Sequence, residues 1–349
     1  MIRFLAFSES LTKIGLYATV PCNLILIYLT AFHCRQITGT YKHMLIFFSA
    51  SCIIFSSLEV VARPFTHNFN GSFLYFSLND YMGLSLNFLQ YSIAIYAGLY
   101  AMNVAFIAIQ FVFRYWTLID YCGLRTFQGK GRLLWAFYLL FVIVAYGYPI
   151  LIFLQPSEFN DEYIREDFNK YYDKDISEYA RFFIIPYEHY QNSTGTRIRW
   201  ENVSFLLFAC PILSFQYIVV IFCTVQMQLN MKQRLKNFSG VNKALQIQFF
   251  RALVVQIILP TLLYSLPALP CLLVPILDIK MSVQSGVIIG LFSVYPPLDS
   301  LALMLIVSEY RRSVKKIFWK IRKNPAVSSV VTRGDSSVSQ KQQSVISMF

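Results

Sequence analysis

Seven long apolar runs, almost without charged residues, decide the solvent in which this chain folds. They lie at 14–34, 43–62, 81–113, 133–157, 202–231, 252–277 and 281–308, and the second and the last are each broken by a single acid, Glu59 and Asp299. A helix needs about 20 apolar residues to cross the hydrocarbon core of a bilayer, whereas a helix of a soluble protein keeps a polar face. The runs therefore predict an all-α membrane protein, a bundle of seven transmembrane helices.

Composition leaves no room for a second kind of domain. The chain has 349 residues, of which 56% are hydrophobic and only 14% are charged, whereas soluble domains carry about 25% charged residues. We expect an outer N-terminus at 1–13, spans at 14–34, 43–62, 89–113, 133–154, 203–227, 252–276 and 283–308, an amphipathic helix at 309–323 and a disordered Ser-rich tail at 324–349. Residues 1–13 are too short and too polar for a signal peptide, so the first run should stay as a helix.

The sequence offers no chemistry typical of an enzyme. It has no GxxxxGK[ST], HExxH or GxSxG motif and no CxxC pair, and its four histidines are scattered. The seven cysteines lie mainly in or beside apolar runs, which argues against a disulfide framework. We therefore expect neither catalysis nor a metal or cofactor.

The distribution of basic residues predicts the orientation. Connections after the first, third, fifth and seventh spans hold 20 of the 30 Lys and Arg residues, whereas ten of the 18 acids lie in the segment 155–202. Because cytoplasmic loops are enriched in Lys and Arg, the N-terminus should be outside and the tail inside, in the plasma membrane. The charge of +12 then faces anionic lipid, and nucleic acid is not expected as a partner.

Four N-x-[ST] sequons can be compared with this orientation. Asn70, Asn192 and Asn202 fall on the predicted outer side and are candidate glycosylation sites, although Asn202 lies close to the bilayer. Asn237 falls on the predicted cytoplasmic side and should remain unmodified.

Polar residues inside the spans mark either function or packing, because burying them in lipid is costly. Asn23, Glu59 and Asp299 are candidates for one inward-facing cluster. It could rearrange during a conformational change, or it could fix the packing of the helices through hydrogen bonds. Prolines inside spans four to seven are weak points that suit a bundle opening on one face, or they are passive kinks.

The third span carries the other candidates. Arg114 closes it at the cytoplasmic mouth, where it could extend to headgroups or cap the interior and contact a partner. Tyr100 and Asn103 lie toward its outer half, and with Tyr264 of the sixth span they are candidates for the lining of a ligand cavity between helices.

The segment 309–323 has an apolar stripe at helical spacing, with Lys and Arg elsewhere. This pattern predicts an amphipathic helix on the inner leaflet. The residues expected to contact lipid are Lys315, Lys316, Phe318 and Trp319.

Three blocks resemble the nematode seven-transmembrane chemoreceptors of the Str type and their Srd, Srh and Srj relatives. Phe113-Arg114-Tyr115 is similar to the family's YRY, residues 245–260 (LQIQFFRALVVQIILP) resemble its sixth helix, and residues 295–301 (YPPLDSL) with Tyr310-Arg311 resemble its YPxxDPL and closing YR. The chain departs from the family at Phe113 and Ser300. No acid precedes Arg114, and the outer loops lack the cysteine of the common link to the third helix.

The resemblance implies a G-protein-coupled receptor bundle with a short eighth helix. It implies a chemosensory receptor for an odorant-like small molecule, coupled to a heterotrimeric G protein and located in the cilium of a sensory neuron. Arg114 and Tyr115 would serve coupling, and Asp299, Glu59 and Asn23 the switch. The alternatives are a ligand-gated cation channel with the inverted orientation and a proton-coupled carrier using Glu59 and Asp299.

Overall fold

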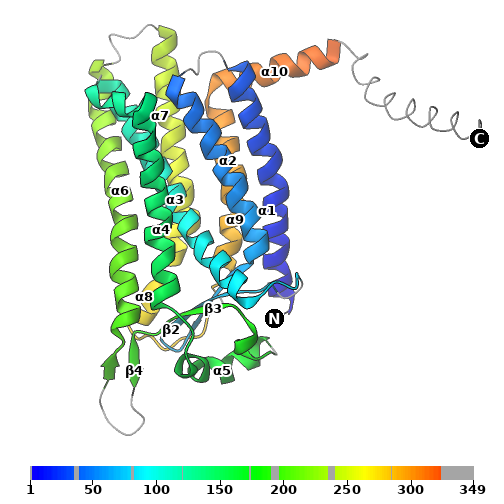
Figure 1. Ribbon diagram of the computed structural model, residues 1–349. Coiled ribbons are helices and arrows are strands. Elements are labelled where there is room, and N and C mark those ends of the chain that lie inside the picture. The colour runs from blue at the N-terminus through cyan, green and yellow to red at the C-terminus, as the bar shows by residue number, and fades with distance from the viewer. Residues whose placement is uncertain are drawn as a thin grey trace, which may run out of the picture.

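The membrane-crossing helices run side by side (Figure 1). The computed structural model describes residues 2–34, 39–79, 82–119, 121–172, 174–189, 196–234, 240–283 and 285–323. Within these ranges seven helical segments are long and apolar enough to cross a membrane, which confirms the predicted seven-helix fold. They are α1 (Ile2–Tyr28) with the π-helical turn η1 (Leu29–His33), α2 (Gly39–Ala62), α3 (Leu86–Ile119), α4 (Arg132–Phe153), α6 (Trp200–Arg234), α7 (Gly240–Pro260) joined to α8 (Leu266–Ile276) by the π-helical turn η6 (Thr261–Ser265), and α9 (Val287–Ile306).

The remaining elements gather at the two ends of the bundle. At the end that holds the N-terminus lie β1 (Pro64–Phe69), β2 (Ser72–Ser77), α5 (Glu158–Tyr172), η4 (Ile176–Glu178), β3 (Arg181–Ile184), β4 (Tyr187–His189) and β5 (Thr196–Ile198). At the opposite end lie the 3-10 turns η2 (Cys122–Phe127) and η3 (Gly129–Gly131), which join α3 to α4, and α10 (Ser308–Lys323), which leads away from α9 (Figure 1).

The first helix begins well before the apolar run that indicated it. It starts at Ile2, and it includes Glu9 and Lys13, whose charges had suggested a boundary near residue 13. Lys13 Nζ lies 2.7 Å from Glu9 Oε1 one turn away, and Arg63 Nη2 lies 2.9 Å from Glu9 Oε2. Because these charges are paired on the helix surface, they do not interrupt the helix.

The strands were not predicted. The chain turns at Asn70-Gly71, where both residues have positive φ (38° and 80°), and this two-residue turn sets the register that pairs Phe69 with Ser72. Asn-Gly is the sequence that such hairpin turns favour. β3 then pairs antiparallel with β2, so a three-stranded sheet joins the connection after α2 to the connection after α4. The segment 155–202, expected to be a loop, thus contributes a helix and strands.

The third helix is the centre of the bundle, because it packs against α2, α4, α6 and α7. Its contact with α4 depends on two glycines. A Cβ atom at Gly98 would lie 2.6 Å from the carbonyl oxygen of Ile143, and one at Gly147 would lie 2.9 Å from that of Ala94. Small residues allow helix backbones to approach closely where no hydrophobic effect drives them together.

A larger residue at this crossing should destabilise the bundle. We expect Gly147→Val to lower the free energy of unfolding by about 1–3 kcal/mol, the usual cost of overpacking. The thermal unfolding midpoint of the purified protein in detergent measures this. Ala136→Val, at an exposed position of the same helix, is the matched control. An equal midpoint for the two variants would contradict the role of the glycine contact.

Candidate functional site

An apolar cavity of about 150 Å³ lies between the helices and the sheet, at the end of the bundle that holds the N-terminus. Its lining comes from α3, α4, α6, α8 and α9 and from all three strands of the sheet. Among the rings that line it, Tyr100 stacks on Phe292 with 5.7 Å between centroids and meets Tyr146 edge-on at 6.5 Å. The cavity thus has an aromatic wall shared by α3, α4 and α9.

A small group of hydroxyls connects this cavity to the break in the sixth span. Tyr100 Oη lies 3.3 Å from Ser265 Oγ, and Tyr217 Oη lies 2.7 Å from the same oxygen. Thr261 Oγ1 donates to Tyr217 Oη at 3.3 Å. Thr261 and Ser265 are the first and last residues of η6, so this hydroxyl group joins α3 and α6 to the point where α7 meets α8.

The three residues proposed for the pocket have different positions. Tyr100 lines the cavity. Asn103 is buried away from the lining, because its Oδ1 accepts a hydrogen bond from Ser51 Oγ of α2 at 3.1 Å. Tyr264 belongs to η6, but its side chain lies outside the part that the structure describes.

The polar residues of the spans form separate contacts along α9 rather than one cluster. Glu59 accepts a hydrogen bond from Ser293 Oγ and one from Thr12 Oγ1, the latter at 3.4 Å. Six residues further along α9, about 9 Å at the helical rise, Asp299 Oδ2 accepts a hydrogen bond from Gln256 Nε2 of α7 at 2.9 Å.

Asn23 belongs to the second of these levels. Its Oδ1 accepts a hydrogen bond from Ser300 Oγ at 2.7 Å, which ties α1 to α9 beside Asp299. Glu59, Asn23 and Asp299 are each 1% exposed. Together they bind α9 to α1, α2 and α7.

Arg114 caps the interior of the bundle. It is 8% exposed, and its guanidinium carbon lies 3.4 Å from the centroid of Tyr41 and 4.1 Å from that of Phe249. Its Nη1 donates to Gln246 Oε1 of α7 at 3.1 Å. Within the described residues no carboxylate pairs with Arg114, so aromatic faces and one neutral amide hold its charge. Tyr115, the next residue, contacts Phe222 of α6 edge-on, with 6.0 Å between centroids.

The inner end of α7 has a second polar contact, with the start of α10. Gln248 Oε1 accepts a hydrogen bond from the backbone N–H of Ser308 at 2.8 Å. Tyr310, fully buried, bonds through its hydroxyl to Thr30 Oγ1 at 2.7 Å and so holds α10 under η1. Lys315, Lys316 and Trp319 are exposed along α10, whereas the side chain of Phe318 lies outside the described part.

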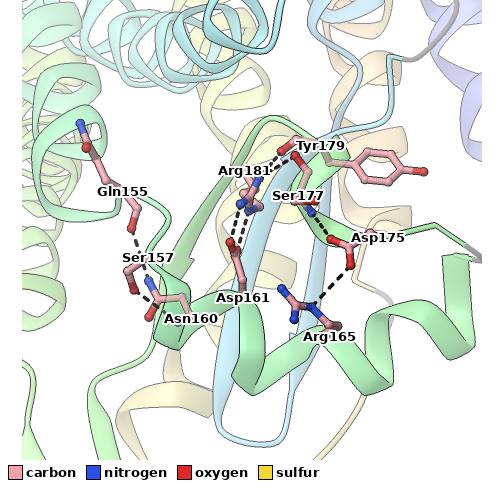
Figure 2. A network of polar contacts seen from close by, with 9 residues as sticks. All are labelled: Gln155, Ser157, Asn160, Asp161, Arg165, Asp175, Ser177, Tyr179 and Arg181. Atoms are coloured by element: carbon pink, nitrogen blue, oxygen red, sulfur yellow. Dashed lines mark hydrogen bonds and ion pairs between the residues drawn. The ribbon is translucent and has the colours of Figure 1, made fainter.

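The sheet, α5 and η4 form what we term the outer cap, after the orientation predicted from the sequence. Figure 2 shows the polar network that joins its parts. Arg181 of β3 donates from Nε and Nη2 to the two carboxylate oxygens of Asp161 in α5, at 2.7 and 2.5 Å. Its Nη1 donates to the carbonyl oxygens of Tyr179 and Ser177, at 2.9 and 3.2 Å. Such a bidentate, largely buried ion pair fixes α5 on the sheet.

Two candidate glycosylation sites fall within the described residues. Asn70 is exposed at the tip of the β1–β2 turn. Asn202 is 2% exposed and its Oδ1 accepts the N–H of Ile185 at 2.7 Å, so a glycan there would have to displace a structural contact. Asn192 lies outside the described residues.

Comparison with known proteins places this bundle in a family. The family of serpentine 7TM G-protein-coupled chemoreceptors of the Str type matches residues 8–315. This chain belongs to the Str family. It is 37% identical to the G-protein coupled receptor str-33 of Caenorhabditis elegans, over 89% of this chain and 90% of that protein. It is 26% identical to the serpentine receptor class r-10 of the same organism, over 86% of this chain and 88% of that protein.

The fold of this Str chain is also that of a solved receptor. Squid rhodopsin aligns with 91% of this chain and 87% of its own, with a TM-score of 0.55 and 11% sequence identity. At that identity the likeness shows the fold alone. Together, the comparisons establish a serpentine chemoreceptor family and a rhodopsin-like bundle.

One histidine of the outer cap is held neutral. His67 is fully buried in β1, where its ring stacks on Phe69 and contacts Tyr172 Oη at 2.8 Å and Ser282 Oγ at 3.3 Å. Burial lowers the pKa of His67 to about 3. In an unfolded chain the pKa of a histidine is about 6.5. Between about pH 3 and pH 6.5 the unfolded state therefore binds a proton that the folded cap does not bind.

The free energy of unfolding of the cap should therefore fall as the pH drops below about 6.5. At pH 5, His67 should account for a loss of about 2 kcal/mol. We expect His67→Gln, which cannot take up the proton, to flatten the decline in unfolding midpoint between pH 7.5 and pH 5. His43→Gln, at an exposed position of α2, should leave the decline unchanged. Equal slopes for the wild type and His67→Gln would rule out His67 as the source.

Proposed function

We propose that this Str chain is a chemosensory, olfactory-type G-protein-coupled receptor. In this proposal it binds an odorant-like small molecule in the apolar cavity and activates a heterotrimeric G protein, in the plasma membrane of a sensory-neuron cilium. The observation that carries the proposal is the position of Tyr100. Its ring lines the cavity, and its hydroxyl contacts Ser265 in the π-helical turn of the sixth span.

The turn η6 is suited to act as a hinge. It follows Pro260, which cannot donate a backbone hydrogen bond, and π-helical turns locally weaken the regular pattern of a helix. A ligand that binds more tightly to one arrangement of the aromatic wall would shift the population toward it. Through Tyr100, Ser265 and Tyr217 that shift would reach the junction of α7 and α8.

Three glutamines hold α7, the inner half of the sixth span, in the arrangement described. Gln246 contacts Arg114 of α3, Gln248 accepts from the first residue of α10, and Gln256 contacts Asp299 of α9. All three contacts use a neutral amide. A hydrogen bond contributes about 0.5–1.5 kcal/mol between neutral groups and 1.5–3 kcal/mol to a charged one. A ligand that binds only modestly more tightly to another arrangement of the helices could therefore break these three contacts. We assign this arrangement to the resting receptor.

The contact between Gln256 and Asp299 is only partly satisfied. In the described part of the chain, Gln256 Oε1 and Asp299 Oδ1 are buried without a hydrogen-bond partner. A half-satisfied buried polar pair gains less from its surroundings than a complete one, which supports Asp299 as a switch residue. Glu59 and Asn23, by contrast, tie α9 to α1 and α2, and we assign them to the static side of the switch.

The same geometry supports Arg114 and Tyr115 as coupling residues. Arg114 Nε and Nη2 have no hydrogen-bond partner in the described residues. If α7 swings outward, the ring of Phe249 and the amide of Gln246 leave with it, and the guanidinium becomes available to a G protein.

Breaking the contact to Arg114 should activate the receptor without a ligand. We expect Gln246→Leu to raise basal G-protein activation about tenfold, because about 1.5 kcal/mol of resting-state stabilisation is lost. Arg114→Ala should instead lower activation, since the group offered to the G protein is gone. Nucleotide exchange on a purified G protein with reconstituted receptor measures both.

Gln128→Leu, at an exposed position between η2 and η3, is the matched control for the loss of an amide. Basal exchange that stays at the wild-type level in a folded Gln246→Leu receptor would rule out this contact as the resting restraint.

Family and fold favour this proposal over a cation channel or a proton-coupled carrier. The orientation also separates them, because the channel has its N-terminus inside. The excess of Lys and Arg around η2, η3 and α10 supports an N-terminus outside. Lys315, Lys316, Phe318 and Trp319 would then lie along the inner leaflet and contact anionic lipid.

Glycosylation tests the orientation directly. We expect a receptor that keeps only the Asn70 sequon to show a glycosidase-sensitive gel shift in cells, because this residue is exposed at a turn of the outer cap. A receptor that keeps only Asn237 should show no shift. A gel shift of the receptor that keeps only Asn237 would show the opposite orientation and would rule out the receptor proposal.

A further inference from the structure

The cavity is closed toward the outer end of the bundle by the sheet. Side chains alternate between the two faces of a strand, and in β2 Phe73 and Tyr75 line the cavity while Leu74 and Phe76 belong to the apolar cluster beneath α5. β3 repeats the pattern, since Phe182 and Ile184 line the cavity while Phe183 belongs to the cluster beneath α5. The sheet therefore forms a roof with an apolar underside.

A second layer covers this roof. Ile164 and Phe168 of α5 are fully buried in the cluster on the outer face of the sheet. The pair of Arg181 and Asp161 fixes the same helix to β3. A water-filled route from outside to the cavity would have to pass through both layers, and removing one partner of such a buried pair is costly.

The wall formed by α6 and α8 is less complete. α6 packs mainly on α3 and α4, and α8 packs mainly on η6 and the sheet. Among the described residues that line the cavity, Cys210 of α6 alone is exposed. Leu207 and Phe208, close to it on α6, are 65% and 56% exposed on the surface that faces lipid. Cys210 is therefore the point at which the lining of the cavity meets the lipid-facing surface of α6.

The lining itself selects against charge. Among the described residues it is formed by aromatic and aliphatic side chains, two cysteines and one threonine, with no Asp, Glu, Lys, Arg or His. The strongly polar side-chain atoms of these described residues are hydroxyls, among which Tyr75 Oη already donates to the carbonyl oxygen of Ile93 at 2.9 Å. A cavity of about this size, lined by apolar residues, holds a molecule such as benzene.

We propose that the ligand is a neutral, lipophilic molecule of about one ring that enters from the bilayer, through the gap between α6 and α8 at Cys210. This inference rests on the proposed function, because it assumes that the cavity is the ligand site. The cap then acts as a fixed roof, and the bilayer concentrates the ligand before it binds.

Photolabelling of the full-length receptor in phosphatidylcholine vesicles tests this route. One probe is a neutral aryl diazirine dissolved in the bilayer, and the other is an impermeant, carboxylated aryl diazirine added to the water. Adducts are located by peptide mass spectrometry. We expect the neutral probe to label Tyr146, Phe205 and Phe292 in the cavity, and the charged probe to leave them unlabelled.

Three variants assign the labelling to the gap. Cys210→Trp should lose the cavity adducts and keep those on lipid-facing residues. Leu207→Trp, which adds the same ring to the same helix away from the lining, should keep both. Ala209→Phe fills the cavity itself and should lose the cavity adducts, which shows that they report the interior. The unfolding midpoint of each variant confirms that it is folded.

Labelling of the cavity by the charged probe would overturn the proposal, as would cavity adducts that persist in Cys210→Trp. Because the readout requires no signalling, the two proposals fail separately. A receptor whose cavity is labelled but that never activates a G protein would rule out the proposed function and still support the entry route. A receptor that signals but whose cavity stays unlabelled would rule out the entry route.

Discussion

Inside the hydrocarbon layer each buried polar group must find its partner within the protein, because no water is there to provide one. This constraint accounts for the seven helices, and it also accounts for where polar side chains occur within them. Glu59, Asn23 and Asp299 each contact a partner on another helix, and α9 takes part in all three contacts. The polar contacts therefore form a seam along α9. Elsewhere close packing of small residues also holds helices together, as at the glycines where α3 crosses α4.

Arg114 shows how the same constraint is met without an opposite charge. The cation lies between the rings of Tyr41 and Phe249 and has one amide as a hydrogen-bond acceptor. A buried carboxylate would attract it far more strongly at low dielectric. Aromatic faces and a glutamine hold Arg114 more weakly than a carboxylate would. Under the proposed function, a small ligand, whose binding energy is limited by its few atoms, could then release this contact.

The sequence was sufficient for the seven-helix fold. It named Tyr100 as a candidate for the lining of a cavity between helices, and it left open whether Arg114, at the end of α3, extends to lipid or caps the interior. The outer cap was missed for two physical reasons. Asn70-Gly71 was interpreted as part of a sequon, although the same dipeptide favours a hairpin turn. The strand that follows it, Ser72–Ser77, has apolar residues on both faces because both are covered, so it lacks the alternation that reveals a half-buried strand.

Asn103 shows a different limit. Helical spacing places it near the face of Tyr100, but spacing cannot say which neighbouring helix covers each part of that face. In the structure Ser51 of α2 covers Asn103, whereas α4, α6 and α9 leave a space beside Tyr100. The face of a helix follows from periodicity, whereas its neighbours follow from the packing of the whole bundle.

The outer cap carries a consequence for how receptors of this kind can differ in ligand preference. The two faces of its sheet have different roles. Leu74 and Phe76 pack in the apolar cluster under α5, whereas Phe73 and Tyr75 line the cavity. Because successive residues of a strand face opposite ways, a substitution at one position alters the cavity without touching the core of the cap. A roof built from strands and held by packing and by the ion pair of Arg181 and Asp161 can thus vary its underside residue by residue, while the helices below keep the contacts that the proposed switch requires.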